Sequence, residues 1–209
     1  MKLGCFNKGH IINKIKNVAI VCSFLFLLSS CTSKFTMLDQ NTIGPVSLHQ
    51  KIFILEYETP KRWMEFSDLR KEKFSDWLLR GFNQLLNDND IESSGIVITH
   101  DDSKKVMKAK KRMISQSGVD GVLQIKPDYA HYKDDMLREI VYNLTFYSLK
   151  NGKKVKVWEG TGRYYLPNAK LTEDPEVMYH LHADKFVNEV LSKLQQSGFI
   201  KPLTLFVTE

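Results

Sequence analysis

The sequence predicts a single α/β domain in which a mixed sheet is covered by three helices, in the order βαβαβββα. Two short apolar runs, each followed by a segment of helical periodicity, predict two parallel strand–helix units. Three later segments with a period of two predict an antiparallel meander. A final amphipathic segment with clear start and stop signals predicts the helix that ends the domain.

The first strand–helix unit begins with the apolar run from Lys51 to Tyr57, which precedes Pro60 and predicts a buried strand. A helix of about twenty residues follows, starting near Phe66 and ending between Asn87 and Asp90, because apolar residues recur at steps of three and four. The predicted apolar stripe consists of Phe66, Phe74, Trp77, Leu78, Phe82 and Leu85.

The second unit pairs a buried strand, Gly95 to Thr99, with a helix from about Ser103 to Gln116. Gly118 supplies the helix stop, because glycine tolerates the left-handed backbone of a C-terminal cap. We expect the apolar face of this helix to contain Val106, Ala109 and Met113.

Three strands follow, at Val119–Tyr132, Leu137–Leu149 and Lys153–Tyr165, with Asn151-Gly152 as the turn of the second hairpin. Asp174 and Pro175 then predict the start of the last helix. Gly198 predicts its end, with Phe199 folding back on the last turn.

The N-terminal thirty residues have the form of a secretory leader. Lys2, Lys8, Lys14 and Lys16 make it positive, and the apolar run Val18–Leu28 is shorter than the roughly 20 residues of a membrane-spanning helix. Leu28, Ser29, Ser30 and Cys31 then resemble the lipobox of bacterial lipoprotein precursors. The predicted organisation is a signal peptide at 1–30, a tether at 31–50 and one periplasmic domain at 51–209.

The lipoprotein resemblance implies that the leader is removed before Cys31 and that this cysteine is lipidated. The Cys31 sulfur would carry a diacylglyceryl group and the freed amine a further acyl chain; no other cofactor is expected. Two acyl chains suffice for stable anchoring. Thr32 and Ser33, rather than aspartate, follow the cysteine. The resemblance then favours the periplasmic face of the outer membrane, within the cell envelope.

Composition agrees with that location. Cys5 and Cys22 lie in the leader, so a mature chain starting at Cys31 has no free thiol after lipidation, as suits an oxidising compartment. The leader holds four of the thirty basic residues and none of the twenty-four acidic ones, which leaves the mature part at about +2. The high isoelectric point therefore gives no indication of a nucleic-acid partner.

Catalytic motifs are missing from the sequence. It contains no Gly-x-Ser-x-Gly, no His-Glu-x-x-His and no phosphate-binding loop with Gly-Lys-Ser/Thr. His180 and His182 stand two apart on a predicted helix and would point in different directions. We therefore expect neither an enzyme nor a metal site.

Two groups of residues are candidate binding surfaces. The first is a hairpin that could present aromatic and acidic groups to a partner, and it contains Tyr129, His131, Tyr132, Asp134 and Asp135. The second is a basic face on the Ser103–Gln116 helix, opposite its expected apolar face, that could bind anions. Its members are Lys104, Lys105, Lys108, Lys111 and Arg112. For both groups an ordinary solvated surface is the favoured interpretation, and a binding surface is the alternative.

Two stretches of the mature chain resemble a broad group of periplasmic lipoprotein domains. They are Gly118–Leu123, and the strand Leu144–Leu149 followed by Asn151-Gly152 and Val157-Trp158-Glu159-Gly160. The group includes the curli-export lipoprotein, the lipoprotein activators of penicillin-binding proteins and the amino-terminal domain of the Tol-system translocation protein. Val119 stands where the group usually has alanine. The resemblance implies a binding or assembly role, and it carries over no catalytic residue.

The leading expectation is thus a lipid-anchored, non-enzymatic module that binds an envelope protein complex. One alternative is a subunit of an oligomeric outer-membrane secretion channel, although charged residues crowd the tip of its longest hairpin. Another is a carrier of a small ligand or lipid, which would need a lined apolar cavity.

Overall fold

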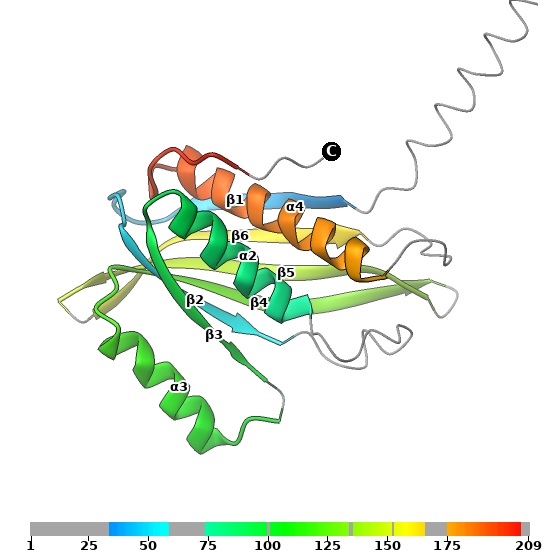
Figure 1. The fold of residues 1–209 in the computed structure, drawn as a ribbon, viewed down its shortest axis with the longest axis horizontal. Coiled ribbons are helices and arrows are strands. Elements are labelled where there is room, and N and C mark those ends of the chain that lie inside the picture. Colours follow the sequence, from blue (N-terminus) through cyan, green and yellow to red (C-terminus); the bar gives the residue numbers. More distant parts are fainter. Residues whose placement is uncertain are drawn as a thin grey trace, which may run out of the picture. The chain divides into compact units, whose positions relative to one another are not determined.

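The computed structural model describes residues 34–58, 74–99, 101–133, 136–151, 153–165 and 175–205, all within the unit Ser33–Glu209. Six strands form one sheet in the order β1-β6-β5-β4-β2-β3 (Figure 1). The strands are β1 Lys34–Thr42, β2 Lys51–Tyr57, β3 Glu92–Ile98, β4 Gly121–Lys133, β5 Met136–Lys150 and β6 Lys153–Tyr165. The helices are α2 Phe74–Asp88, α3 Lys104–Gln116 and α4 Pro175–Gln196.

The predicted α/β class and the mixed sheet are confirmed. β2 pairs in parallel with both β3 and β4, as two strand–helix units require, and β4, β5 and β6 form the antiparallel meander. Asn151, in the turn between β5 and β6, has a φ of 52°, the left-handed backbone that a two-residue hairpin turn needs.

The predicted tether at 31–50 is wrong for the part that the structure describes. Residues Lys34–Thr42 form β1, which pairs antiparallel with β6 at the edge of the sheet. The Phe35 ring is buried, and its centroid lies 4.0 Å from that of Phe186 on α4. Gly162 on β6 makes room for that ring, because a Cβ at this position would overlap it.

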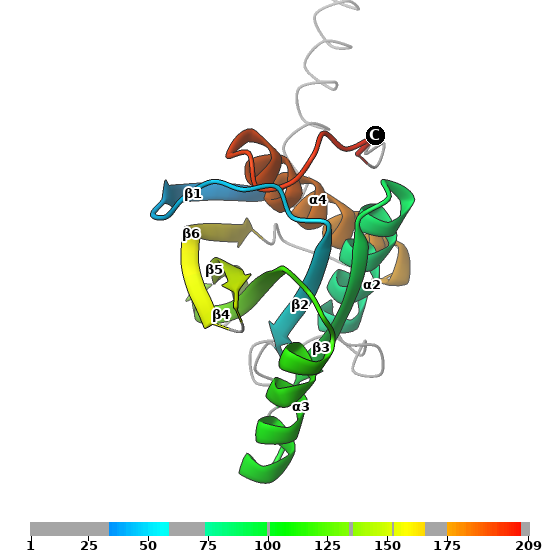
Figure 2. The same cartoon turned by 90° about the vertical axis from the view of Figure 1, so that its left-hand side faces the viewer.

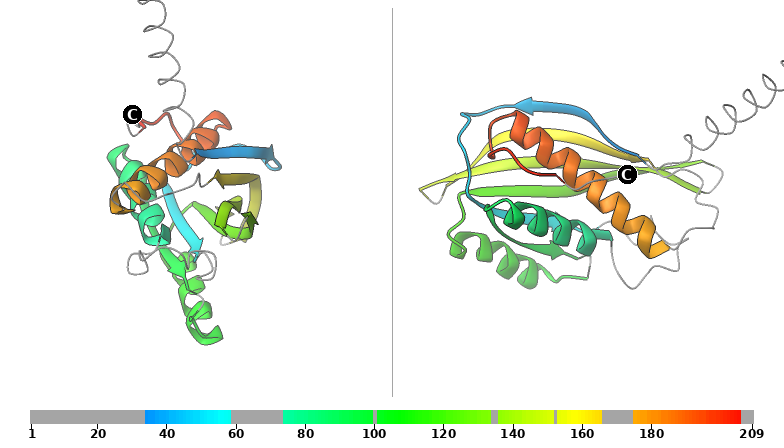
Figure 3. Two further views of the ribbon diagram at one scale, coloured as in Figure 1. Left: turned by 90° about the vertical axis from the view of Figure 1, so that its right-hand side faces the viewer. Right: turned by 45° about the horizontal axis from the view of Figure 1, so that its top comes forward.

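The main core lies on one face of the sheet, under α2 and α4. Figures 1 and 3 show both helices crossing this face. α2 buries Phe74, Leu78, Phe82, Leu85 and Leu86, which confirms most of the predicted stripe. Trp77 is half-buried against the core, and Phe66 lies outside the described residues. α4 buries Ala183, Phe186, Val187, Val190, Leu191 and Leu194.

Helix α4 ends as predicted. Gly198 has a φ of 77°, and the Phe199 amide donates to the Leu194 carbonyl over 3.0 Å. The Phe199 side chain is fully buried, so the chain after the helix is held against the core.

Helix α3 covers the sheet far less than predicted. It lies on the opposite side of the sheet, next to the edge strand β3, and extends away from the other elements (Figure 2). Only Met107 and Ile114 of α3 pack on the small second cluster of Phe53, Leu55, Ile98 and Val122. The expected core face is also wrong, because Val106, Ala109 and Met113 are exposed.

Candidate functional site

Helix α3 is fixed at its N-terminal end by polar contacts. The Ser103 hydroxyl caps the helix by accepting from the Val106 amide at 3.3 Å. The Asp102 carboxylate accepts from Lys110 Nζ at 2.7 Å and from the Thr99 amide at 2.9 Å. These two hydrogen bonds, first that of Lys110, lower the pKa of Asp102. Lys110 Nζ also donates to the Val97 carbonyl on β3 at 2.9 Å, so this lysine anchors the helix.

The remaining basic residues of α3 are all exposed. They are Lys104, Lys105, Lys108, Lys111 and Arg112, the basic face predicted from the sequence. Beside them stand two exposed apolar side chains, Val106 at 42% and Met113 at 47% exposure. We call the combined surface of Val106, Met113, Lys104, Lys105, Lys108 and Arg112 the outer face of α3. Lys111 is not part of it, because this lysine lines the groove described next.

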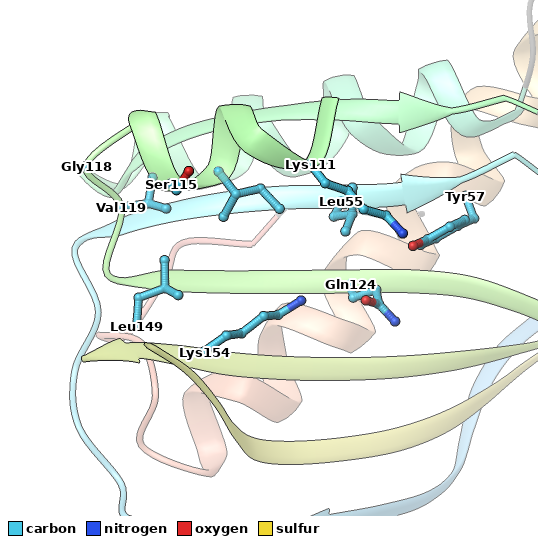
Figure 4. Close-up of a pocket in the computed structure, with 10 residues that line it drawn as sticks. Leu55, Tyr57, Lys111, Ser115, Gly118, Val119, Gln124, Leu149 and Lys154 are labelled. Atoms are coloured by element: carbon cyan, nitrogen blue, oxygen red, sulfur yellow. The ribbon is translucent and has the colours of Figure 1, made fainter. Parts of the chain in front are cut away.

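A groove of about 540 Å³ runs between the inner side of α3 and the sheet (Figure 4). Its walls come from six parts of the fold: β2, α3, the loop after α3, β4, β5 and β6. The apolar lining residues are Leu55, Ile114, Val119 and Leu149. Tyr57, Ser115 and Gln124 add hydroxyl and amide groups.

Two lysines reach into this groove from opposite walls, Lys111 from α3 and Lys154 from β6 (Figure 4). Lys111 Nζ lies 5.6 Å from the centroid of the Tyr57 ring, and Lys154 Nζ lies 3.7 Å from that of Tyr147. The Lys154 side chain as a whole is exposed, but partial desolvation of its ammonium group lowers its pKa, and the positive charge of Lys111 lowers the pKa further. Among the described residues, neither lysine forms a salt bridge, and none that lines the groove is acidic.

Sequence reasoning missed this groove. Its residues are scattered from Leu55 to Lys154, and no local pattern brings them together. One signal was available, because the predicted Asn151-Gly152 turn places Leu149 opposite Lys154 on neighbouring strands. That pairing puts a cation next to an apolar side chain, but it does not reveal that α3 closes the other wall.

The predicted hairpin surface is described only in part. Tyr129 is 47% exposed and His131 is exposed, both on β4 toward the tip of the β4–β5 hairpin. Asp134 and Asp135 lie outside the described residues, as does the side chain of Tyr132. No group of three metal-binding side chains occurs within the part of the chain that the structure describes.

The lipobox residues Leu28, Ser29, Ser30 and Cys31 also lie outside the described residues, so lipidation stays a prediction. The side chains of His180 and His182 are likewise not described. Of the helices in the described ranges, none has the length and apolar character needed to span a membrane.

No protein family model and no curated protein matches the chain. Among solved structures, it is similar to the PelC dodecamer from Paraburkholderia phytofirmans, with 11% identity over 80% of this chain and 99% of that one, at a TM-score of 0.41. The hypothetical protein CT253 from Chlamydia trachomatis shares 12% identity over 71% of this chain and 96% of that one, at a TM-score of 0.46. Scores in this range do not establish a shared function, which must rest on the residues of this chain.

Proposed function

We propose that the protein is a lipid-anchored, non-enzymatic binding module of the cell envelope. In this proposal Cys31 carries the lipid at the periplasmic face of the outer membrane, and the outer face of α3 docks on an acidic surface of an envelope protein. The lipobox Leu28-Ser29-Ser30-Cys31 and the positive leader support the location.

The observation that carries the docking role is the exposure of α3. None of the 13 side chains of α3, all of which the structure describes, is buried. A helix of this length is marginal in water without packing. Exposed Val106 and Met113 would lose contact with water when a partner covers them, which gives docking an apolar centre.

The charge of α3 indicates the chemistry of the partner. The helix contains six basic residues and no acidic one, whereas the mature chain as a whole is close to neutral. Opposite charge on the partner would steer the encounter and fix its orientation. The helix has no aromatic residue and no leucine, which are the residues that anchor helices in lipid interfaces, so a protein surface is favoured over a bilayer.

The anchor is tested by mass spectrometry of the protein purified from bacterial membranes. The expected product begins at Cys31 and carries the mass of a diacylglyceryl group with an added acyl chain. A Cys31→Ala variant should lose incorporation of a palmitate analogue and leave the membrane fraction. An unmodified chain that still begins at Met1 would contradict the proposed location.

The docking role is tested with serine substitutions at the outer face of α3. Val106→Ser combined with Met113→Ser should abolish co-purification of the partner after in-cell crosslinking, because the apolar centre of the interface is lost. Val155→Ser is the matched control, since Val155 on β6 has the same 42% exposure as Val106. Equal recovery of the partner with the wild type, the double variant and the Val155→Ser control would contradict docking through α3.

A further inference from the structure

We propose that the groove between α3 and the sheet binds a small anionic amphiphile, a molecule with one acidic group and a short apolar body. This ligand site goes beyond the docking role, because it uses the inner side of α3 and the sheet rather than the outer face of the helix. The acidic group would lie between Lys111 and Lys154, and the apolar body along Ile114 and Leu149.

The charges of the groove favour an anion. Lys111 and Lys154 approach the same space, where each repels the other, and no described carboxylate neutralises either of them. A bound carboxylate or phosphate would relieve this repulsion and accept charge-assisted hydrogen bonds from both ammonium groups. The same charges would disfavour a cationic ligand.

The lining and size of the groove favour an apolar body on that anion. Ile114, Val119 and Leu149 are half-buried and present aliphatic surface, which would be removed from water together with the ligand. The volume of about 540 Å³ lies within the range of small-ligand pockets. The groove also offers Gln124 and Tyr57, whose amide and hydroxyl can orient a polar head.

The test compares three probes that share an eight-carbon chain and differ in head group: octanoate, octanol and octylammonium. Each is titrated calorimetrically into the full chain held in zwitterionic nanodiscs, with empty nanodiscs as the blank. Octanoate should bind saturably, and octanol should bind at least about tenfold more weakly because it makes no ion pair. Octylammonium should give no heat above the blank.

Substitutions then locate the site. Lys154→Gln and Lys111→Gln should each weaken octanoate binding about tenfold, as expected for loss of one charged hydrogen bond. Lys108→Gln is the control, because Lys108 is an exposed lysine on α3 that does not line the groove. It should leave the affinity unchanged. Thermal unfolding of each variant checks that the fold is kept. We expect no loss of stability, because all three lysines are exposed.

Several outcomes would overturn the proposal. Absence of octanoate binding would show that the groove holds no such ligand. Equal binding of octanoate and octylammonium, or equal affinity in the Lys154→Gln and Lys108→Gln variants, would show that the two groove lysines do not select it. A phosphate source is distinguished from a carboxylate one by repeating the titration with octyl phosphate.

Discussion

His49 and Phe199 are joined by two hydrogen bonds although 150 residues separate them. The His49 amide donates to the Phe199 carbonyl at 2.9 Å, and its Nδ1 lies 3.1 Å from the same oxygen. A carbonyl only accepts, so Nδ1 carries a proton, and in the neutral ring Nε2 accepts from the Ser148 hydroxyl at 3.2 Å. The imidazole therefore connects the segment before β2 with β5 and with the end of α4.

Replacing this imidazole should lower stability more than removing the Ser148 hydroxyl. His49→Ala loses two buried hydrogen bonds and the contact with Phe146, and should reduce the free energy of unfolding by about 2 kcal/mol. Ser148→Ala should cost about 1 kcal/mol, because it removes one of these bonds. Urea denaturation measures both, and equal losses would contradict the central place of His49.

The contact between Gly162 and Phe35 tests whether β1 belongs to the domain. Gly162→Ala should reduce the free energy of unfolding by about 2 kcal/mol, because the added methyl group overlaps the Phe35 ring. In a Phe35→Ala background the same substitution should cost almost nothing. If Gly162→Ala costs the same in both backgrounds, the ring does not occupy the space above Gly162.

Glu56 should make stability fall as pH rises. Its side chain is buried on β2, and among the described residues it forms no salt bridge. Burial raises the pKa of Glu56 well above 4.5; the Ser75 hydroxyl opposes this in part, and the charge of Asp76 adds a smaller increase. Between 4.5 and the raised value, the folded state binds more protons than the unfolded state. The free energy of unfolding therefore decreases with rising pH in this window.

Glu56→Gln removes this titration. The variant should be more stable than the wild type at pH 7, and the difference should disappear below pH 4.5, where both states of the wild type are protonated. Chemical denaturation between pH 4 and pH 8 measures the two curves. Parallel curves would show that Glu56 has the same pKa in the folded and unfolded chains.

Helix α3 should open without unfolding of the rest of the domain. It buries no side chain, whereas α2 and α4 form the core, so α3 amides should exchange with deuterium much faster than theirs. Ser103→Ala removes the N-terminal cap, which should lower the stability of α3 by about 1 kcal/mol and speed exchange in this helix further. Exchange in α3 as slow as in α2 would contradict its loose attachment.

The sequence predicted the sheet and the core well, because alternating and helical apolar patterns report directly on burial. Strands β2 and β4–β6 and the stripe containing Leu78 and Phe82 follow from those patterns. β1 was missed because its strand, Lys34–Thr42, is mostly polar, and of its described side chains only that of Phe35 is buried. Gly160 and Gly162 on β6 could have indicated a neighbouring strand, because they make room for Met37 and Phe35 of β1. That role depends on a strand far away in the chain.

The orientation of α3 could not be predicted from its sequence. Val106 and Met113 form one apolar set and Met107 and Ile114 another, about 100° apart on the helix. Periodicity does not decide which set faces the sheet. The anchoring of Lys110 by Asp102 and by the Val97 carbonyl decides it, and that contact joins residues of three different segments.

The most direct test of docking through α3 is site-specific photocrosslinking in living cells. A photoreactive residue in place of Met113 should crosslink to the acidic surface of a partner protein. The same photoreactive residue in place of Val155 should give no crosslink. Charge reversal by Lys104→Glu and Lys108→Glu should abolish the Met113 crosslink, because opposite charge fixes the orientation. Crosslinks only to lipid, or equal crosslinks from Met113 and Val155 that survive the charge reversal, would contradict a protein partner bound by the outer face of α3.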